Sequence, residues 1–195
     1  MSDSENGGVE PLELPSGIVK IKKESPEDEV KIKALREPII AKAIREGNIM
    51  VRELEGFDTV VVYAFGSLKL YQALRKKLGQ PVTENREASG YCCFWQSQIG
   101  RNGFIAIVWV NDTYLKNRLD GLPSFVHEIS HLADYVFNQT GIDNPSGEAK
   151  AYFMENEFAK VANKFFGMDL EPAITENQVM EALNDKPDKS DKSDK

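Results

Sequence analysis

The sequence predicts an α+β domain, because a strand-like run and a β-hairpin pattern are followed by two long stretches of helical periodicity. The strand-like runs are rich in β-branched and aromatic residues, which predicts a small sheet. Polar, low-complexity sequence surrounds this pattern. We therefore expect a disordered leader over residues 1–24, one domain over residues 25–184 and a disordered charged tail over residues 185–195.

The composition favours a globular protein of the cytoplasm. Hydrophobic residues make up 41% of the chain and charged residues 28%. The N-terminal sequence lacks the basic start and apolar core of a signal peptide, and the most apolar stretch, residues 60–65, is far shorter than the ~20 residues of a membrane span. The net charge of −7 argues against a nucleic-acid partner. Nothing in the sequence indicates an oligomeric state.

The first helix is predicted to begin at Ser25-Pro26-Glu27-Asp28. This segment combines a capping serine, a first-turn proline and acids near the positive end of the helix dipole. We expect the helix to end near Gly47-Asn48. Its apolar stripe would comprise Val30, Leu35, Ile39, Ala43 and Ile44.

A buried strand is predicted at Thr59–Phe65, a continuous run of β-branched and aromatic residues. The segment just before it stays unassigned. A helix should follow from Ser67, and the basic triplet Arg75–Lys77 would form its solvated end. One side of this helix would carry Leu68, Tyr71 and Leu74.

A β-hairpin is predicted from two further strand-like runs, Tyr91–Gln96 and Phe104–Val110, which a Gly- and Asn-containing connection separates. Residues 82–90 form a polar loop before it. Cys92 and Cys93 are neighbours, so their side chains would point to opposite faces of the strand. We therefore expect two buried thiols rather than a disulfide.

Two long helices should follow the hairpin. Pro123 is a favourable residue for the first turn of one, and the other would run over Glu148–Phe166 and end at Gly167. The turn-forming residues 138–147 would separate them. Glu176–Leu183 is a further, short amphipathic candidate.

The first of these helices contains an H-E-x-x-H motif, formed by His127, Glu128 and His131, and the chain has no other histidine. Residues four apart lie on one helix face with about 5–6 Å between Cβ atoms, so both rings can hold one zinc ion. Glu128 can then take a proton from a metal-bound water. The spacing therefore predicts a Zn²⁺ site with hydrolytic chemistry.

The periodicity of the motif helix places the metal side away from the core. At about 100° per residue one narrow stripe is apolar and should face the core. This stripe comprises Phe125, Ile129, Leu132 and Val136. The other side comprises His127, Glu128, His131, Asp134 and Tyr135.

A catalytic zinc takes three protein ligands, and the preferred third ligand is Glu148. It opens the next helix after a loop long enough to reverse the chain direction. The predicted core stripe of that helix places Glu148 at the border between core and cleft. This stripe comprises Ala151, Met154, Phe158, Val161, Ala162 and Phe165.

Other residues remain candidates for the third ligand. Asp134 would overshoot the metal from the same helix as both rings, and it suits a supporting role or a salt bridge. Glu155 lies two turns beyond Glu148 and likewise suits a supporting role. Cys92 or Cys93 would imply a different enzyme.

A tyrosine hydroxyl near the metal could stabilise the oxyanion of a tetrahedral intermediate. Tyr152 follows Glu148 by one helical turn, and Tyr135 follows His131 by one turn. We prefer Tyr152 as the catalytic tyrosine, although packing is the more common role of tyrosines at helix interfaces.

The motif, followed by a glutamate on the next helix, resembles the zincin metallopeptidases of the gluzincin type. The resemblance implies a mixed sheet whose edge strand borders the cleft, with Phe104–Val110 as that edge strand and a peptide adding beside it. It also implies His127, His131 and Glu148 as zinc ligands and Glu128 as general base.

The glutamate helix departs from the gluzincin pattern. Gluzincins commonly carry E-x-x-x-D there, with the aspartate orienting a ligand histidine, whereas this chain has Glu148-Ala-Lys-Ala-Tyr152. Either Asp134 takes over this orienting role or the histidine is held differently. The E-A-x-A-Y form resembles the small single-domain metallopeptidases carried by bacteriophages, over about residues 90–166, which would imply a host cytoplasm.

The leading hypothesis is a zinc-dependent metallopeptidase acting on a peptide or protein. A second is a hydrolase like peptide deformylase, with Cys92 or Cys93 as ligand, although the E-G-C-L-S-like and glycine-rich signatures are absent. A third is a zincin-like zinc-binding protein without activity that captures a host protein. Retention of Glu128 argues against the third, because binding alone needs no base.

Overall fold

The computed structural model describes residue 27 and residues 37–80, 88–97, 103–113, 115–139 and 147–171. The predicted leader (1–24), the charged tail (185–195) and the short helix candidate Glu176–Leu183 lie outside these residues. So does most of the segment in which a helix was predicted to begin at Ser25.

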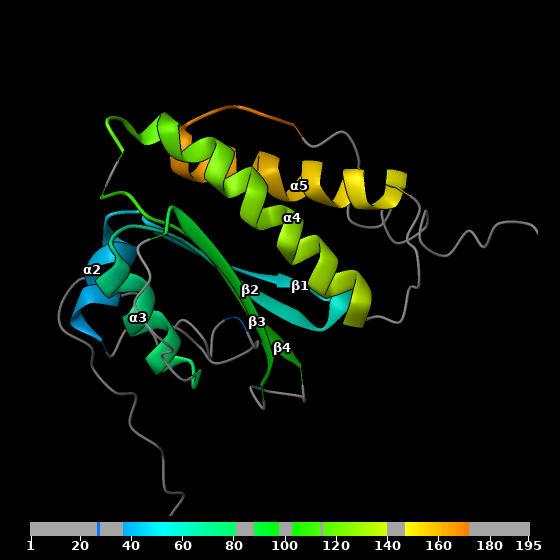
Figure 1. Ribbon diagram of the computed structural model, residues 1–195, viewed down its shortest axis with the longest axis horizontal. Coiled ribbons are helices and arrows are strands. Elements are labelled where there is room, and N and C mark those ends of the chain that lie inside the picture. Colours follow the sequence, from blue (N-terminus) through cyan, green and yellow to red (C-terminus); the bar gives the residue numbers. More distant parts are fainter. Residues whose placement is uncertain are drawn as a thin grey trace, which may run out of the picture.

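A four-stranded mixed sheet forms the centre of the fold (Figure 1). Its strands are β1 (Ile49–Leu54), β2 (Thr59–Phe65), β3 (Gly90–Gln96) and β4 (Phe104–Val110). The order across the sheet is β1-β2-β4-β3. β2 and β4 are parallel, whereas β1 with β2 and β3 with β4 are antiparallel. The prediction of an α+β fold with a mixed sheet is therefore confirmed, as are the strand Thr59–Phe65 and the hairpin.

The prediction that Phe104–Val110 is the edge strand is wrong. β4 pairs with β2 on one side and β3 on the other, so it lies inside the sheet. The edge strand next to β4 is β3, which has no second strand partner among the described residues. The run of apolar residues in β4 reflects this position, because an interior strand covered on both faces contacts other apolar groups all round.

Helices cover both faces of the sheet (Figure 1). α2 (Pro38–Arg45) and α3 (Leu68–Lys77) lie on one face, and α4 (Leu122–Gln139) and α5 (Gly147–Phe166) lie on the other. Short 3₁₀ turns, η1 (Glu55–Phe57) and η2 (Arg118–Gly121), precede β2 and α4. Alternate strand residues fill the two apolar layers: Val60 and Val62 contact the α2–α3 layer, and Val61 and Tyr63 the α4–α5 layer.

The N-terminal helix differs from its prediction, although its end near Gly47 is confirmed. α2 begins at Pro38, and Glu37 before it is extended, with φ −106° and ψ 118°. A proline disfavours helical conformation in the residue before it, so one helix cannot run from Ser25 through Glu37. The unassigned segment before β2 is β1, whose polar Arg52 and Glu53 hide the strand pattern.

The predicted stripe of α4 is confirmed, because Phe125, Ile129, Leu132 and Val136 are all buried. Glu128 differs from expectation, since it is also buried while the other residues assigned to the metal side are exposed. The helix periodicity alone could not reveal this, because β3 covers Glu128 from the side.

The predicted stripe of α5 is confirmed in part. Val161, Ala162 and Phe165 are buried, and Met154 and Phe158 are half-buried against the α4–α5 core, whereas Ala151 is exposed. A buried stripe with four-residue spacing also runs through the helix, and it comprises Ala149, Phe153, Glu157, Val161 and Phe165. A charged residue at its centre made this stripe look less apolar than its neighbour.

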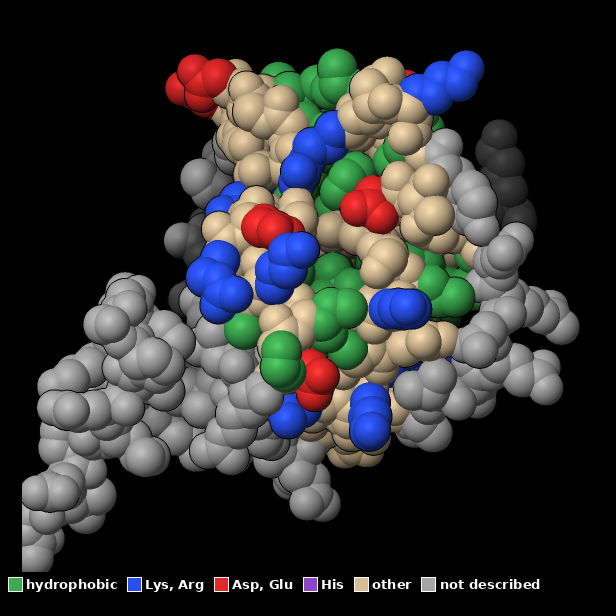
Figure 2. Space-filling model, turned by 90° about the vertical axis from the view of Figure 1, so that its left-hand side faces the viewer, with side chains coloured by type: hydrophobic (Ala, Val, Ile, Leu, Met, Phe, Trp, Pro, Cys, Tyr) green, Lys and Arg blue, Asp and Glu red, His purple; other side chains and the backbone are tan. Residues whose placement is uncertain are grey.

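One face of the molecule mixes charges of both signs (Figure 2). Over the described residues on this face, Lys and Arg are interspersed with Asp and Glu instead of forming one basic patch. The triplet Arg75–Lys77 occupies the last turn of α3, as predicted, where it faces the negative end of the helix dipole. None of the described helices has the length and apolarity needed to cross a membrane.

Candidate metal centre

The two histidine rings of α4 converge on one point. Nε2 of His127 and Nε2 of His131 lie 3.2 Å apart, and the ring planes are inclined by 84°. Two nitrogens that each lie about 2.0–2.1 Å from one zinc at a tetrahedral angle are about 3.3 Å apart. Both rings are exposed, so an ion can reach them. The pair therefore fits a shared zinc ion.

Glu128 lies beside these rings but in a different environment. Its side chain is buried against β3, where a Cβ added to Gly90 would lie 3.0 Å from Cγ and 3.1 Å from Oε1 of Glu128. Burial raises the pKa of Glu128, while the charges of His127 and His131 and a hydrogen bond from the Cys92 backbone oppose this shift. A carboxylate with a raised pKa is a better proton acceptor, which suits a general base.

The polar edge of β3 faces outward next to Glu128. Asn111 N donates to Ser89 O at 2.9 Å and Ser97 N to Gly103 O at 2.8 Å, beyond the two ends of the β3–β4 pairing. Hydrogen-bonded pairs alternate in an antiparallel ladder, so these bonds assign odd-numbered residues of β3 to pairing with β4. The outward backbone groups belong to Gly90, Cys92, Phe94 and Gln96.

Glu148 and Tyr152 contact each other on α5. The hydroxyl of Tyr152 donates to Oε1 of Glu148 at 2.9 Å, and this bond raises the pKa of Tyr152. Glu148 is exposed and Tyr152 half-exposed. Among the described residues, no three His, Cys, Asp or Glu side chains are grouped so that they could hold a metal. The structure thus brings His127 and His131 together, whereas Glu148 as third ligand and Tyr152 as catalytic residue stay predictions.

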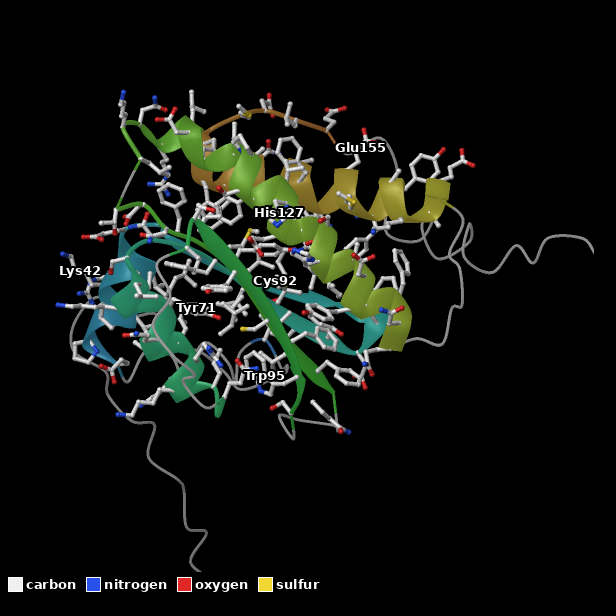
Figure 3. The ribbon with its side chains drawn as sticks, in the orientation of Figure 1. Lys42, Tyr71, Cys92, Trp95, His127 and Glu155 are labelled. Atoms are coloured by element: carbon white, nitrogen blue, oxygen red, sulfur yellow. The ribbon has the colours of Figure 1, made fainter. Side chains whose placement is uncertain are left out.

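The two rival acids on these helices are exposed. Asp134 forms an ion pair with Lys150 of α5 at 2.6 Å, which confirms the salt bridge expected of it and gives its carboxylate a partner other than a histidine. This pair ties the first turn of α5 to α4 one turn beyond His131. Glu155 lies further along α5 (Figure 3).

The cysteines confirm the expected alternation. Cys92 faces the α4–α5 layer and Cys93 the α2–α3 layer, and both are free thiols. Figure 3 shows Cys92 below His127, with Tyr71 and Trp95 toward the opposite side of the sheet. Burial raises the pKa of the Cys92 thiol far above its usual range, and Cys93 and Glu128 add to the shift.

Aromatic rings border the site beyond His131. Phe94 of β3 stacks on Tyr135 of α4, with 5.6 Å between ring centroids, and on Phe104 of β4, with 5.0 Å. Tyr135 is 40% exposed and follows His131 by one turn, so this stack continues the metal side of α4 along β3. Burial raises the pKa of Tyr135, with smaller contributions from Cys92, Cys93 and Glu128.

A buried ionic cluster lies beneath α5, and the sequence did not reveal it. The hydroxyl of Tyr63 on β2 donates to Glu157, whose Oε1 also lies 3.6 Å from Arg52 and 3.2 Å from Lys160. Glu157 is only 1% exposed. The four-residue repeat from Ala149 to Phe165 was the signal that could have located it.

Gly90 is a further residue that the sequence patterns do not reveal, because they predict a polar loop over residues 82–90. Its contact with Glu128 joins residues 38 positions apart, so no local pattern marks it.

Comparison with known proteins adds no family: no family model, curated protein or solved structure matches this chain.

Proposed function

We propose that the protein is a zinc-dependent metallopeptidase, with His127 and His131 as zinc ligands and Glu128 as general base. The observation that carries this proposal is the 3.2 Å separation of the two Nε2 atoms next to a buried carboxylate. A bound zinc supplies Lewis-acid polarisation of a carbonyl group and makes water acidic near neutral pH. Glu128 takes the proton of the attacking water and passes it to the leaving amine.

Glu148 is the proposed third ligand. The ion pair of Asp134 with Lys150 supports this choice, because it joins the first turn of α5 to α4 one turn beyond His131. Glu148 would exchange its hydrogen bond from Tyr152 for the metal, which leaves the Tyr152 hydroxyl able to donate to a developing oxyanion.

The substrate is proposed to be an extended peptide that adds to the outward edge of β3. Phe94 and Gln96 present outward backbone groups there, and Phe94 stacks on Tyr135 of the motif helix. Main-chain hydrogen bonds of this kind can position the carbonyl group of a peptide whatever its side chains are. This arrangement suits a peptide bond as the substrate group.

Cleavage of a peptide library with and without a chelator tests the proposal, with Glu128→Gln as the matched variant. We expect chelator-sensitive cleavage that Glu128→Gln lowers by about 10²-fold or more while zinc stays bound. Full activity of Glu128→Gln would contradict the role of Glu128. Zinc binding without any cleavage would favour the alternative of a zincin-like binding protein.

A hydrolase like peptide deformylase is the second candidate, and one observation favours it. Cys92 lies on the α4 side of β3, and its backbone donates a hydrogen bond to Glu128 of the motif. Zinc content after replacement of Cys92 or Glu148 separates the two candidates.

A further inference from the structure

Glu128 is held by the edge strand as well as by its own helix. Its carboxylate accepts a hydrogen bond from the backbone of Cys92, and its Cγ and Oε1 occupy the space where Gly90 has no side chain. Gly90 is confined from the other side too, because a Cβ there would lie 2.9 Å from the carbonyl oxygen of Trp109. A side chain at position 90 would therefore have to push aside this backbone oxygen or Glu128, and glycine avoids both contacts.

The Cys92 amide is suited to this role because it points away from β4. The β3–β4 register leaves the N–H of Cys92 on the outward edge, where no strand of the described chain consumes it. A carboxylate that accepts a backbone N–H forms a charge-assisted bond, which is shorter and stronger than a neutral one. The second carboxylate oxygen stays available for a proton.

We propose that Gly90 and the backbone amide of Cys92 are positioning residues that fix the carboxylate of Glu128 on the edge of β3, beside the histidine pair. This inference rests on the proposed function in assigning Glu128 as the base. Its consequence is that base and substrate are aligned by the same strand: Glu128 takes the edge position at Cys92, and the peptide pairs with the positions beyond it, at Phe94 and Gln96.

Hydrogen exchange of single amides in the zinc-free protein tests the contact without any reaction. In Glu128→Ala the Cys92 amide should exchange at least about tenfold faster than in the wild type, because its acceptor is lost. In Glu128→Gln it should stay protected, because the amide oxygen of the glutamine can still accept. The Phe94 amide on the same edge is the internal control and should not change.

Gly90→Ala tests the functional consequence. The added methyl should displace Glu128 and lower kcat by about 10²-fold, with KM changed less than about threefold and zinc content unchanged. Gly147→Ala is the matched control, because a Cβ there meets no atom within 4 Å. It should keep the wild-type kcat.

An unchanged Cys92 exchange rate in Glu128→Ala, or an unchanged kcat in a folded Gly90→Ala, overturns the inference but leaves zinc-dependent hydrolysis intact. A wild-type protein that binds no zinc and cleaves no peptide overturns the proposed function instead. The exchange measurement still decides the contact in that case, and it does so even if Gly90→Ala fails to fold.

Discussion

Asp134 on α4 and Lys150 on α5 form an ion pair at 2.6 Å, three residues beyond one histidine of the motif and two residues beyond Glu148. The pair is partly exposed, with 54% and 32% of the side-chain surface accessible, so its direct contribution to folding is small. Its significance lies in position, because it joins the helix of the histidines to the helix of the proposed third ligand.

Replacing Lys150 by alanine should therefore affect metal binding more than stability. We expect the free energy of unfolding to fall by about 0.5 kcal/mol and zinc affinity by about tenfold, since Glu148 loses its restraint. Urea unfolding and zinc titration measure the two effects. The reversed pair, Asp134→Lys with Lys150→Asp, should restore affinity, and failure to do so would argue against an ionic restraint.

The third ligand can be identified by comparing two variants. Glu148→Ala should weaken zinc binding by more than about 10²-fold, because losing a direct ligand costs more than losing a supporting contact. Cys92→Ala should bind zinc as the wild type does. The opposite outcome, with zinc lost only in Cys92→Ala, would favour the deformylase-like alternative.

Two tyrosines allow a matched test of burial. Tyr63 and Tyr152 each donate to a glutamate, but Tyr63 is fully buried and Tyr152 is half-exposed. Tyr63→Phe should lower the free energy of unfolding by about 2 kcal/mol, because a buried charged acceptor loses its donor. Tyr152→Phe should change it by less than about 0.5 kcal/mol. An equally small loss of unfolding free energy in both variants would mean that Arg52 and Lys160 satisfy Glu157 when the Tyr63 hydroxyl is absent.

Stability should fall in mildly alkaline solution because of the cysteines. Burial raises the thiol pKa of Cys92 and of Cys93 in the folded state above the value of about 8.5 in an unfolded chain. Above that pH the unfolded chain releases protons that the folded chain retains, so rising pH favours unfolding. The raised tyrosine pKa values add to this only above about pH 10.

Cys92→Ala should make this decline shallower by up to about 1.4 kcal/mol per pH unit between about pH 8.5 and pH 10. Chemical denaturation at a series of pH values measures the slope. A slope identical to that of the wild type would show that Cys92 is ionised in the folded protein over this range.

Local patterns in the sequence were enough for much of the fold. Thr59–Phe65 is continuously apolar because it is an interior strand, and the stripe of Phe125, Ile129, Leu132 and Val136 repeats at helical spacing because one side of α4 meets the sheet. The convergence of His127 and His131 follows from the same helix geometry. Each of these features is decided within one element.

Features that depend on how elements meet could not be predicted in this way. The edge position of β3 depends on β4 pairing with β2, which no pattern inside either strand encodes. Glu128 is buried because Gly90 lets α4 approach the strand. Glu157 of α5 is buried because Tyr63 of β2 and Arg52 of β1 contact its carboxylate. A stripe predicted from apolar residues alone therefore omits it.

The most direct test of the central claim is calorimetric titration of metal-free protein with Zn²⁺, together with the variants His127→Ala and His131→Ala. We predict one zinc per chain in the wild type and loss of binding in each variant. The 3.2 Å separation of the two Nε2 atoms fits two ligands of one zinc ion, and each replacement removes one of them. Absence of binding in the wild type, or binding that survives both replacements, would contradict the assignment of His127 and His131 as a zinc site.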